Sequence, residues 1–447
     1  MFSRVLIANR GEIALRIIRA CRELGIGTVA VYSEADREGS WLRHADQAIC
    51  IGGGPAAESY LNIPRIIAAA EVANADAIHP GYGFLAENAH FAEICRDCRI
   101  EFIGPTPEAM AKLGDKVSCK QTAKAAKVPV FPGSEGAITE EDEAASIAKK
   151  IGYPVIIKAS AGGGGRGMRV AHNEVALRAG IKQAQNEAQA AFGNGAVFIE
   201  KYLERARHVE VQTIGDKFGE AVYLYERDCS VQRRHQKLIE EAPGPHIDPR
   251  RREEVCKAAA RLIKSAGYHG AATVEFLMDD KQNFYMLEVN TRVQVEHPVT
   301  ELITGIDIVK TMIRVAAGEP MPFKQRDVQI RGHAIECRIN AEDPQRNFAP
   351  SAGQITRWEV PGGPGVRLDT HVVPGYRVPT NYDSMIAKLL VHADDRAQAI
   401  RRMDRALREF VVEPIKTTIG LHRELMADAG FNQGGVDIHY LERLLKK

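Results

Sequence analysis

The chain has 447 residues, of which 45% are hydrophobic and 26% are charged, values ordinary for about three globular domains. Lys and Arg (59) nearly balance Asp and Glu (58), which argues against broad binding to nucleic acid or anionic membranes but allows a local basic phosphate pocket. No stretch resembles a signal peptide or approaches the ~20 apolar residues of a membrane span. We therefore expect a soluble, cytoplasmic protein whose eight cysteines are thiols.

The first ~110 residues alternate short apolar runs with segments of helical periodicity. Short strands are predicted at residues 4–8, 28–33, 48–50, 76–80 and 101–105. A helix is predicted at 11–25, and strands that alternate with helices imply a parallel sheet. Residues 1–114 are thus predicted to form a Rossmann-like domain. Its first strand is followed by ANRGEIA rather than GxGxxG, so a scaffold that also forms a rim of the active site is favoured over nucleotide binding there.

A glycine-rich segment, SAGGGGRGMRV (160–170), lies between two predicted strands. Four successive glycines cost conformational entropy on ordering, but they expose backbone N–H groups that suit a flexible flap over phosphates. Lys158, at the end of the preceding strand, would add a point charge for the same anion. No Gly-Lys-Ser/Thr follows, which excludes a Walker loop, and a flexible surface turn is the alternative.

Two strand patterns flank the polar sequence DDKQN, which predicts a hairpin. If Lys281 and Gln282 centre the turn, Glu275 lies directly opposite Glu288 on one face. Facing carboxylates destabilise a strand pair unless something neutralises them, and their oxygens are preferred ligands of Mg²⁺ or Mn²⁺. Asn290 shares this face and offers a third oxygen.

Polar residues continue at every second position after this point: Glu288, Asn290, Arg292, Gln294 and Glu296. A period of two predicts one continuous strand with a dry face and a row of metal ligands, a fork-shaped cation and another carboxylate. The alternative is a half-exposed amphipathic strand. The mixture of functional types favours a site.

A cationic cluster lies in YERDCSVQRRHQKLIEEAP and comprises Arg227, Arg233, Arg234, His235 and Lys237. Because the overall charge is near zero, such a cluster suggests anion binding. The alternative is a mesh of salt bridges with Glu226, Asp228, Glu240 and Glu241. Two smaller signals are GYGF (81–84), which lines a pocket or turns the chain, and Arg338, which points away from its apolar neighbours if its segment is extended.

Seven segments of the chain, in order, resemble biotin carboxylase, an ATP-grasp enzyme. They are ANRGEIALR (8–16), HPGYGFLAEN (79–88), GDK (114–116), YPVIIKASAGGGGRGMRV (153–170), ERDCSVQRRHQK (226–237), EVNTRVQVEHPVTE (288–301) and RGHAIECRINAED (331–343). The likeness runs from Ile7 to near Tyr440. NTRVQVEHPVTE and HAIECRINAE resemble biotin-dependent carboxylases rather than ATP-grasp ligases in general.

The resemblance implies a multidomain protein of α/β and α+β type. Its parts would be a Rossmann-like N-terminal domain (1–114), an ATP-grasp domain (115–330) with a mobile lid at about 131–203, and a mixed C-terminal domain (331–447). The implied reaction carboxylates biotin with ATP and bicarbonate through carboxyphosphate, the first half-reaction of acetyl-CoA or acyl-CoA carboxylase in malonyl-CoA and fatty acid synthesis. The alternatives are another ATP-grasp ligase and a non-catalytic binding protein.

The resemblance also assigns residues. For ATP it implies Lys116, Lys158, Gly163, Gly164, Gly165, Glu200, Lys201, Leu203, His208, Gln232 and His235. For Mg²⁺ or Mn²⁺ it implies Glu275, Glu288 and Asn290, which the hairpin selects independently. For bicarbonate it implies Lys237, Arg292, Gln294 and Val295. Glu296 would be the general base and Arg338 would stabilise the biotin enolate, with Tyr82 near the biotin ring.

The biotin acceptor sequence of the family's carrier domain, Ala/Val-Met-Lys-Met, is absent from the printed sequence. We therefore expect biotin as a substrate linked to a separate biotin carboxyl carrier protein, with carboxyltransferase subunits as further partners. The family also implies a homodimer, formed through the helix that contains Arg16, Arg19 and Glu23 and through the C-terminal domain. We expect no nucleic-acid or membrane partner.

Overall fold

The computed structural model describes residues 1–138, 140–159, 168–192 and 195–446. The chain divides into two compact units. The larger comprises residues 1–128, 207–276 and 288–447, and the smaller comprises 129–206 and 277–287. None of the described helices combines the length and the apolar character needed to cross a membrane.

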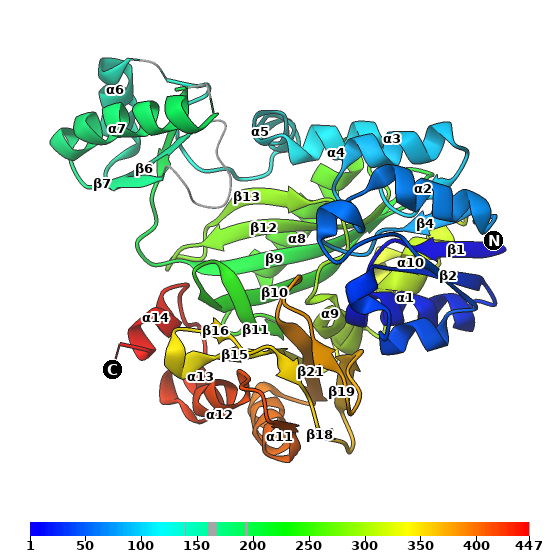
Figure 1. Ribbon diagram of the computed structural model, residues 1–447. Coiled ribbons are helices and arrows are strands. Elements are labelled where there is room, and N and C mark those ends of the chain that lie inside the picture. Colours follow the sequence, from blue (N-terminus) through cyan, green and yellow to red (C-terminus); the bar gives the residue numbers. More distant parts are fainter. Residues whose placement is uncertain (139, 160–167, 193–194, 447) are drawn as a thin grey trace. The chain divides into compact units, whose positions relative to one another are not determined.

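A five-stranded parallel sheet begins the larger unit, in the order β3-β2-β1-β4-β5 (Figure 1). Its strands are β1 (Arg4–Ile7), β2 (Gly27–Tyr32), β3 (Gln47–Cys50), β4 (Ala77–His79) and β5 (Glu101–Phe102). Successive residues of β1 enter different cores: Val5 and Ile7 pack with α1 (Gly11–Glu23), and Leu6 packs with α2 (Ile63–Val72) and α3 (Ala89–Asp97). This confirms the predicted Rossmann-like arrangement.

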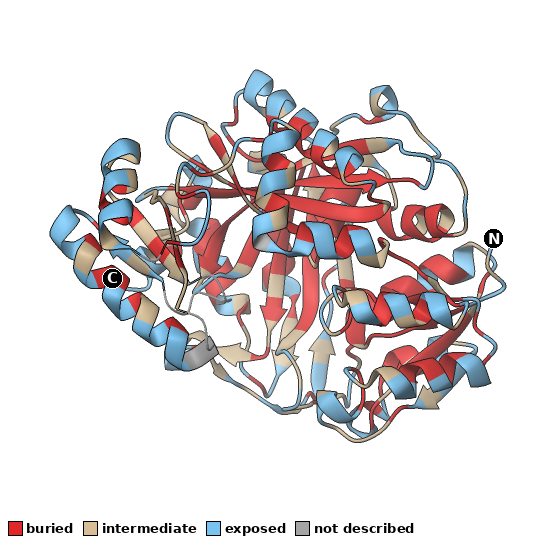
Figure 2. Ribbon diagram, turned by 90° about the horizontal axis from the view of Figure 1, so that it is seen from above, coloured by how far each residue is buried: buried red, intermediate tan, exposed pale blue. Residues whose placement is uncertain are grey.

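The second sheet has eight strands in the order β13-β12-β9-β10-β11-β14-β21-β19. They are β9 (Arg207–Gly215), β10 (Ala221–Arg233), β11 (Gln236–Ala242), β12 (Gly270–Met278), β13 (Phe284–Asn290), β14 (His333–Asn340), β19 (Val366–Thr370) and β21 (Met385–Ala393). Figure 2 shows that these strands are largely buried, whereas the helices expose their outer sides. The sheet therefore joins strands from the predicted central and C-terminal domains.

Two helices cover opposite faces of this sheet. Glu226 of β10 accepts a hydrogen bond from Arg252 of α8 (Pro249–Ser265), whereas the next residue, Arg227, donates to Thr300 of α9 (His297–Thr304). Consecutive strand residues point to opposite faces, so α8 and α9 lie on different sides. The side that carries α9 holds the charged residues described below.

The C-terminal region adds a helical layer and three short strand pairs. Its helices are α11 (Arg396–Glu409), α12 (Ile419–Ala427), α13 (Ala429–Gln433) and α14 (Tyr440–Leu444). The pairs are β15 (Glu342–Asp343) with β16 (Ala349–Pro350), β17 (Gly353–Gln354) with β20 (Arg377–Val378), and β18 (Arg357–Glu359) with β22 (Val411–Glu413). Cys337, Ile339 and Leu389 share a core with α11 and α12.

The remaining described α-helices of the larger unit are α4 (Pro107–Gly114), α5 (Lys116–Ala125) and α10 (Ile308–Ala316).

The smaller unit contains a three-stranded antiparallel sheet, β7-β6-β8, with two helices. Its elements are α6 (Glu141–Ile151), β6 (Val155–Ala159), β7 (Arg169–Ala171), α7 (Glu174–Phe192) and β8 (Val197–Lys201). Ile157, Leu177 and Val197 are among the fully buried residues of its core. The predicted glycine flap, with Gly163, Gly164 and Gly165, lies outside the described residues.

The predicted hairpin forms, but its turn is one residue longer than expected. Gln282 donates to the carbonyl of Asp279, the backbone N–H of Asp279 donates to Asn283, and Gln282 adopts a left-handed conformation (φ 59°). Lys281 and Gln282 therefore do not centre a two-residue turn. The predicted continuation of the second strand to Glu296 is also wrong, because β13 ends at Asn290 and α9 begins at His297.

Candidate active site

A row of charged side chains crosses the large sheet on its α9 side, one or more from each of six adjacent strands. The row comprises Glu275 (β12), Glu210 (β9), Arg227 (β10), Lys237 (β11), Arg338 (β14) and Lys388 (β21). Arg227 lies directly opposite Glu210 in the strand register, and Arg338 lies opposite Lys388. Cys337 and Ile339 on either side of Arg338 are fully buried in the other core, which confirms the predicted direction of the Arg338 side chain.

Lys237 is held by three carboxylates, and we call these four residues the Lys237 cluster. Its Nζ lies 2.6 Å from Glu210 Oε2, 2.7 Å from Glu296 Oε1 and 3.0 Å from Glu275 Oε1. Burial alone lowers the pKa of Lys237, but the three carboxylates raise this pKa well above its ordinary value. Lys237 is therefore a fixed positive charge in a region shielded from water.

Glu296 bridges two cations. It is only 2% exposed, and its second oxygen, Oε2, lies 2.9 Å from Arg338 Nη2. Burial raises the pKa of Glu296, but Lys237 and Arg338 together hold this pKa well below its usual range. Glu296 is thus an ionised, water-shielded carboxylate, the form that a general base requires.

Arg227, which is fully buried, fixes the segment that precedes Glu296. Its guanidinium donates to Glu210 (2.6 Å) and to Gln294 Oε1 (2.9 Å), and Gln294 Nε2 donates onward to Glu275 (2.9 Å). A planar guanidinium with several donors holds such a network in one geometry. The loop after β13 therefore presents polar side chains to the Lys237 cluster although it is not a strand.

Arg338 has a second carboxylate partner. Its Nη2 lies 2.5 Å from Glu240 Oε1, and Glu240 is fully buried. Burial raises the pKa of Glu240 to about 7, although Arg338 opposes this rise. Glu240 Oε2 has no hydrogen-bond partner among the described residues. Arg338 is therefore placed between an ionised carboxylate, Glu296, and one that titrates near neutral pH.

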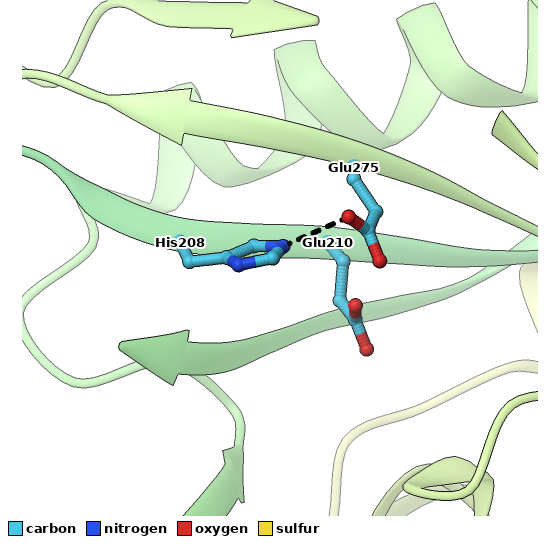
Figure 3. Close-up of side chains that lie close together, drawn as sticks. All are labelled: His208, Glu210 and Glu275. Carbon is cyan, nitrogen blue, oxygen red and sulfur yellow. Dashed lines mark ion pairs between the residues drawn. The ribbon is translucent and has the colours of Figure 1, made fainter. Parts of the chain in front are cut away.

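Glu275 lies close to His208 and Glu210 (Figure 3). His208 Nε2 lies 3.2 Å from Glu275 Oε2, and Asn290 Nδ2 donates to Glu275 Oε1 (3.0 Å). Glu288 is exposed and stands two residues before Asn290 on β13, so both residues share a side of that strand. Carboxylate and amide oxygens of this kind fit a hard divalent cation.

Arg292 and Tyr82 are the other predicted substrate residues in the larger unit. Arg292 Nε donates to Glu87 (2.9 Å) and Nη2 donates to Asn290 Oδ1 (3.0 Å). The Tyr82 hydroxyl donates to Glu12. Gly81 and Gly83 have φ values of 65° and 68°, so GYGF turns the chain while it presents Tyr82.

The residues predicted for ATP are distributed over both units. In the smaller unit, Lys158 Nζ lies 2.6 Å from Glu200 Oε2, Lys201 Nζ donates to two backbone carbonyls (Gly152 and Tyr153), and Leu203 is half-buried. In the larger unit, His208 and Gln232 are buried, and Gln232 lies opposite Lys237 in the strand register. His235 is exposed, and the side chain of Lys116 lies outside the described part of the chain.

The predicted cationic cluster does not form a single group. Arg227 and Lys237 are among the buried charges of the site. Arg233 instead contacts Asn347, and the exposed Arg234 and His235 form the turn between β10 and β11. The alternative salt-bridge mesh is wrong as well, because the four acids pair with cations from elsewhere. Glu226 pairs with Arg252, Asp228 with Arg207, Glu240 with Arg338, and Glu241 with His333 and Arg396.

Comparisons with known proteins match this arrangement along the whole chain. The family described as biotin carboxylase, N-terminal domain, matches residues 1–110, and the biotin carboxylase C-terminal domain matches 336–443. Between them, the ATP binding domain of carbamoyl-phosphate synthase L chain matches 115–324. A biotin carboxylase of Allochromatium vinosum is 56% identical over 446 residues, covering 100% of this chain and 99% of the relative. The chain belongs to the biotin carboxylase family.

Solved structures of biotin carboxylases share the fold. A biotin carboxylase–β,γ-ATP complex from Campylobacter jejuni is 51% identical with a TM-score of 0.94, and 99% of each chain is covered. The biotin carboxylase domain dimer of Hydrogenobacter thermophilus 2-oxoglutarate carboxylase, with MgADP, ADP and bicarbonate, is 50% identical with a TM-score of 0.92, covering 99% of this chain and 98% of that one. Biotin carboxylases are ATP-dependent ligases that carboxylate biotin with bicarbonate, so the predicted ATP-grasp fold and enzyme class are confirmed.

Sequence reasoning missed Glu210 and Lys388, and it gave Glu240 only a place in a local salt-bridge mesh. Glu210 lies in HVEVQTI between two valines, and this local alternation could have indicated a polar residue on one face of a strand. The partners of Glu240 and Lys388 are far away in the sequence, and no local pattern identifies them. The residue roles and the domain boundaries near 114 and 330 stay predictions.

Proposed function

We propose that the Lys237 cluster, together with Arg292 and Arg338, carries out the carboxylation of biotin by carboxyphosphate chemistry. The observation that carries this proposal is Glu296, an ionised and buried carboxylate held between Lys237 and Arg338. Bicarbonate is a weak electrophile, so ATP must first phosphorylate it. Glu296 accepts the bicarbonate proton as the bicarbonate oxygen attacks the γ-phosphorus of ATP, and ADP leaves.

The surrounding residues position and neutralise the anions. Lys237, Arg292 and Gln294, with the backbone at Val295, bind bicarbonate, since ammonium and guanidinium donors suit a small oxyanion. Glu275, Glu288 and Asn290 hold Mg²⁺ or Mn²⁺, which supplies charge neutralisation for the transferred phosphoryl group. Lys116, Lys158, the glycine segment, Glu200, Lys201, Leu203, His208, Gln232 and His235 bind ATP.

Biotin enters the second half of the reaction. Carboxyphosphate breaks down to CO₂ and phosphate, phosphate takes the N1′ proton of biotin, and Arg338 stabilises the resulting enolate while the enolate nitrogen attacks CO₂. Tyr82 lies beside the biotin ring. Biotin arrives on a carrier protein, and a carboxyltransferase then passes the carboxyl group to acetyl-CoA or another acyl-CoA.

The activity test uses free biotin. Release of ADP by the purified chain should require bicarbonate and should rise with free biotin, because an ATP-grasp ligase for another substrate ignores biotin. Glu296→Ala is expected to abolish biotin carboxylation while the KM for ATP stays nearly unchanged. Glu253→Ala, which removes an exposed carboxylate from α8, is the matched control. A fully active Glu296→Ala enzyme would remove Glu296 from the mechanism.

Native complexes identify the partners. Affinity purification of the chain from its own cells should recover a biotinylated carrier and a carboxyltransferase, and the acceptor specificity of that carboxyltransferase identifies the final substrate. A carboxyltransferase that is specific for a 2-oxo acid would contradict the acyl-CoA assignment.

A further inference from the structure

Lys388 is a fully buried lysine in the middle of β21. Its side chain is 0% exposed, it lies between Ala387 and Leu389, and it stands opposite Arg338 in the strand register. A buried ammonium costs free energy unless it is paired and hydrogen-bonded. The partners of Lys388 therefore indicate why a charge is kept at this position.

The partners belong to two separate predicted substrate segments. Lys388 Nζ donates to the backbone carbonyl of Val295 (2.9 Å), the residue before Glu296. The same Nζ lies 3.1 Å from Glu12 Oε1 and 6.0 Å from the centre of the Tyr82 ring. Glu12 in turn accepts the hydrogen bond of the Tyr82 hydroxyl. One ion pair thus connects the segment before Glu296 with the tyrosine predicted to lie beside biotin.

Glu12 is well placed for this connection. Its side chain is 3% exposed, and it lies in the first turn of α1, directly after strand β1. Asn9, in the same connection, donates from Nδ2 to the carbonyls of Pro80 and Tyr82 (both 2.7 Å). Asn9 therefore holds the backbone at Tyr82 and Glu12 holds its hydroxyl, and Lys388 connects Glu12 to the carbonyl of Val295.

Stability alone does not explain the pair. A buried salt bridge is often no more stabilising than well-packed apolar residues of the same volume, because desolvation offsets the attraction. A directional ammonium that bonds a particular carbonyl does fix geometry, however, and small displacements of catalytic groups reduce rates strongly. The contacts of Lys388 fit the second purpose.

We propose that Lys388 and Glu12 form a positioning pair for biotin carboxylation. The pair holds the Val295 carbonyl, and thereby the approach of Glu296, at a fixed distance from Tyr82. This proposal rests on the proposed function of Glu296 and Tyr82. Neither Lys388 nor Glu12 touches the reacting atoms, so both act through Val295 and Tyr82.

The test compares Lys388→Met, Glu12→Gln and the double variant in steady-state ADP release, with biotin, bicarbonate and ATP each varied. We expect kcat/KM for biotin to fall about tenfold or more in Lys388→Met and in the double variant, with the KM for ATP within about twofold of wild type. Arg252→Met is the matched control, because it breaks another buried ion pair, with Glu226 (2.7 Å), on the opposite face of the sheet. It should lose stability and keep the wild-type kinetics for biotin.

The double variant separates positioning from stability. It removes both charges of the pair, so its urea midpoint should recover in part relative to Lys388→Met, while Glu336 and Asp369 still lose the attraction of Lys388 and kcat/KM for biotin stays low. Recovery of both properties would show that the pair is only structural and would overturn the proposal, as would wild-type kinetics in Lys388→Met. Wild-type enzyme that shows no biotin-dependent ADP release would instead contradict the proposed function. If Lys388→Met does not fold, the double variant and Glu12→Gln decide the question.

Discussion

Replacement of Lys237 by methionine removes a cation whose Nζ lies within 3.0 Å of three buried carboxylates. Met has a similar length and no charge, so the change leaves the packing volume nearly intact. Removing one partner of a buried ion pair costs about 3–5 kcal/mol, because the remaining charge is left uncompensated. We therefore expect the free energy of unfolding of Lys237→Met to be lower than that of wild type by about this amount at pH 8.

The loss should depend on pH. Without Lys237, the burial that raises the pKa of Glu210, Glu275 and Glu296 is less opposed, and repulsion from Glu296 and Glu275 adds to it at Glu210. The folded variant therefore binds a proton at a pH where the unfolded chain, with its ordinary carboxyl pKa, does not. A raised folded pKa gives stability that disappears as the pH rises. The difference between variant and wild type should therefore shrink by up to about 1.4 kcal/mol for each pH unit between 8 and 6.

Urea unfolding at pH 8 and pH 6, followed by circular dichroism, measures both effects through the midpoint and slope. Lys257→Met is the control, because Lys257 pairs with Glu253 (2.6 Å) on the exposed side of α8. An exposed pair contributes less than about 0.5 kcal/mol. A loss below about 1 kcal/mol in Lys237→Met, or one that is equal at both pH values, would refute the electrostatic account of the cluster.

Three further results are expected. Burial lowers the pKa of His79, His297 and His371 to about 3. Below pH 6.5 the unfolded chain therefore binds more protons than the folded protein, and each histidine should lower the free energy of unfolding by about 2 kcal/mol at pH 5. An unchanged urea midpoint between pH 7.5 and 5 would contradict this. EDTA should stop biotin-dependent ADP release, and either Mg²⁺ or Mn²⁺ should restore it; activity without a divalent cation would exclude the metal assignment. Arg19→Glu, on the exposed side of α1, should dissociate the predicted homodimer, because a symmetric interface contains the reversed charge twice; sedimentation velocity measures this, and an unchanged dimer places the interface elsewhere.

The sequence predicted those parts of the fold that local patterns determine. The parallel sheet followed from apolar runs separated by helical periodicity, and Arg338 was oriented correctly because its two neighbours are apolar in an extended segment. The same reasoning failed between Thr291 and Glu296, where Thr291, Val293, Gln294 and Glu296 are buried without forming a strand. Val293 and Gln294 are both buried because the polar Gln294 bonds Arg227 instead of facing water, and a sequence period of two does not by itself distinguish such a loop from a strand.

The charged network of the site was beyond local reasoning. Acidic and basic residues in ERDCSVQRR suggested pairing within the segment, but each strand residue meets partners on neighbouring strands and helices that are distant in sequence. Glu226 and Arg227 are adjacent, yet they pair on opposite faces of the sheet with Arg252 and Glu210. Only the strand order, which no single segment encodes, determines these contacts.

The pairing of Glu296 explains how one carboxylate serves both halves of the proposed reaction. While ionised, Glu296 neutralises Lys237 and Arg338. Once it takes the bicarbonate proton, its attraction for both cations weakens at the moment when anionic phosphate, and later the biotin enolate, need positive partners. Lys237, which keeps Glu210 and Glu275, then has one fewer anionic partner and can attract the phosphate, while Arg338, which keeps Glu240, can attract the enolate. The pKa of Glu240 is raised to about 7, so near neutral pH Glu240 is only partly ionised and attracts Arg338 less than a full negative charge would. Moving the Arg338 guanidinium toward the enolate therefore costs less free energy than it would if both carboxylates were ionised.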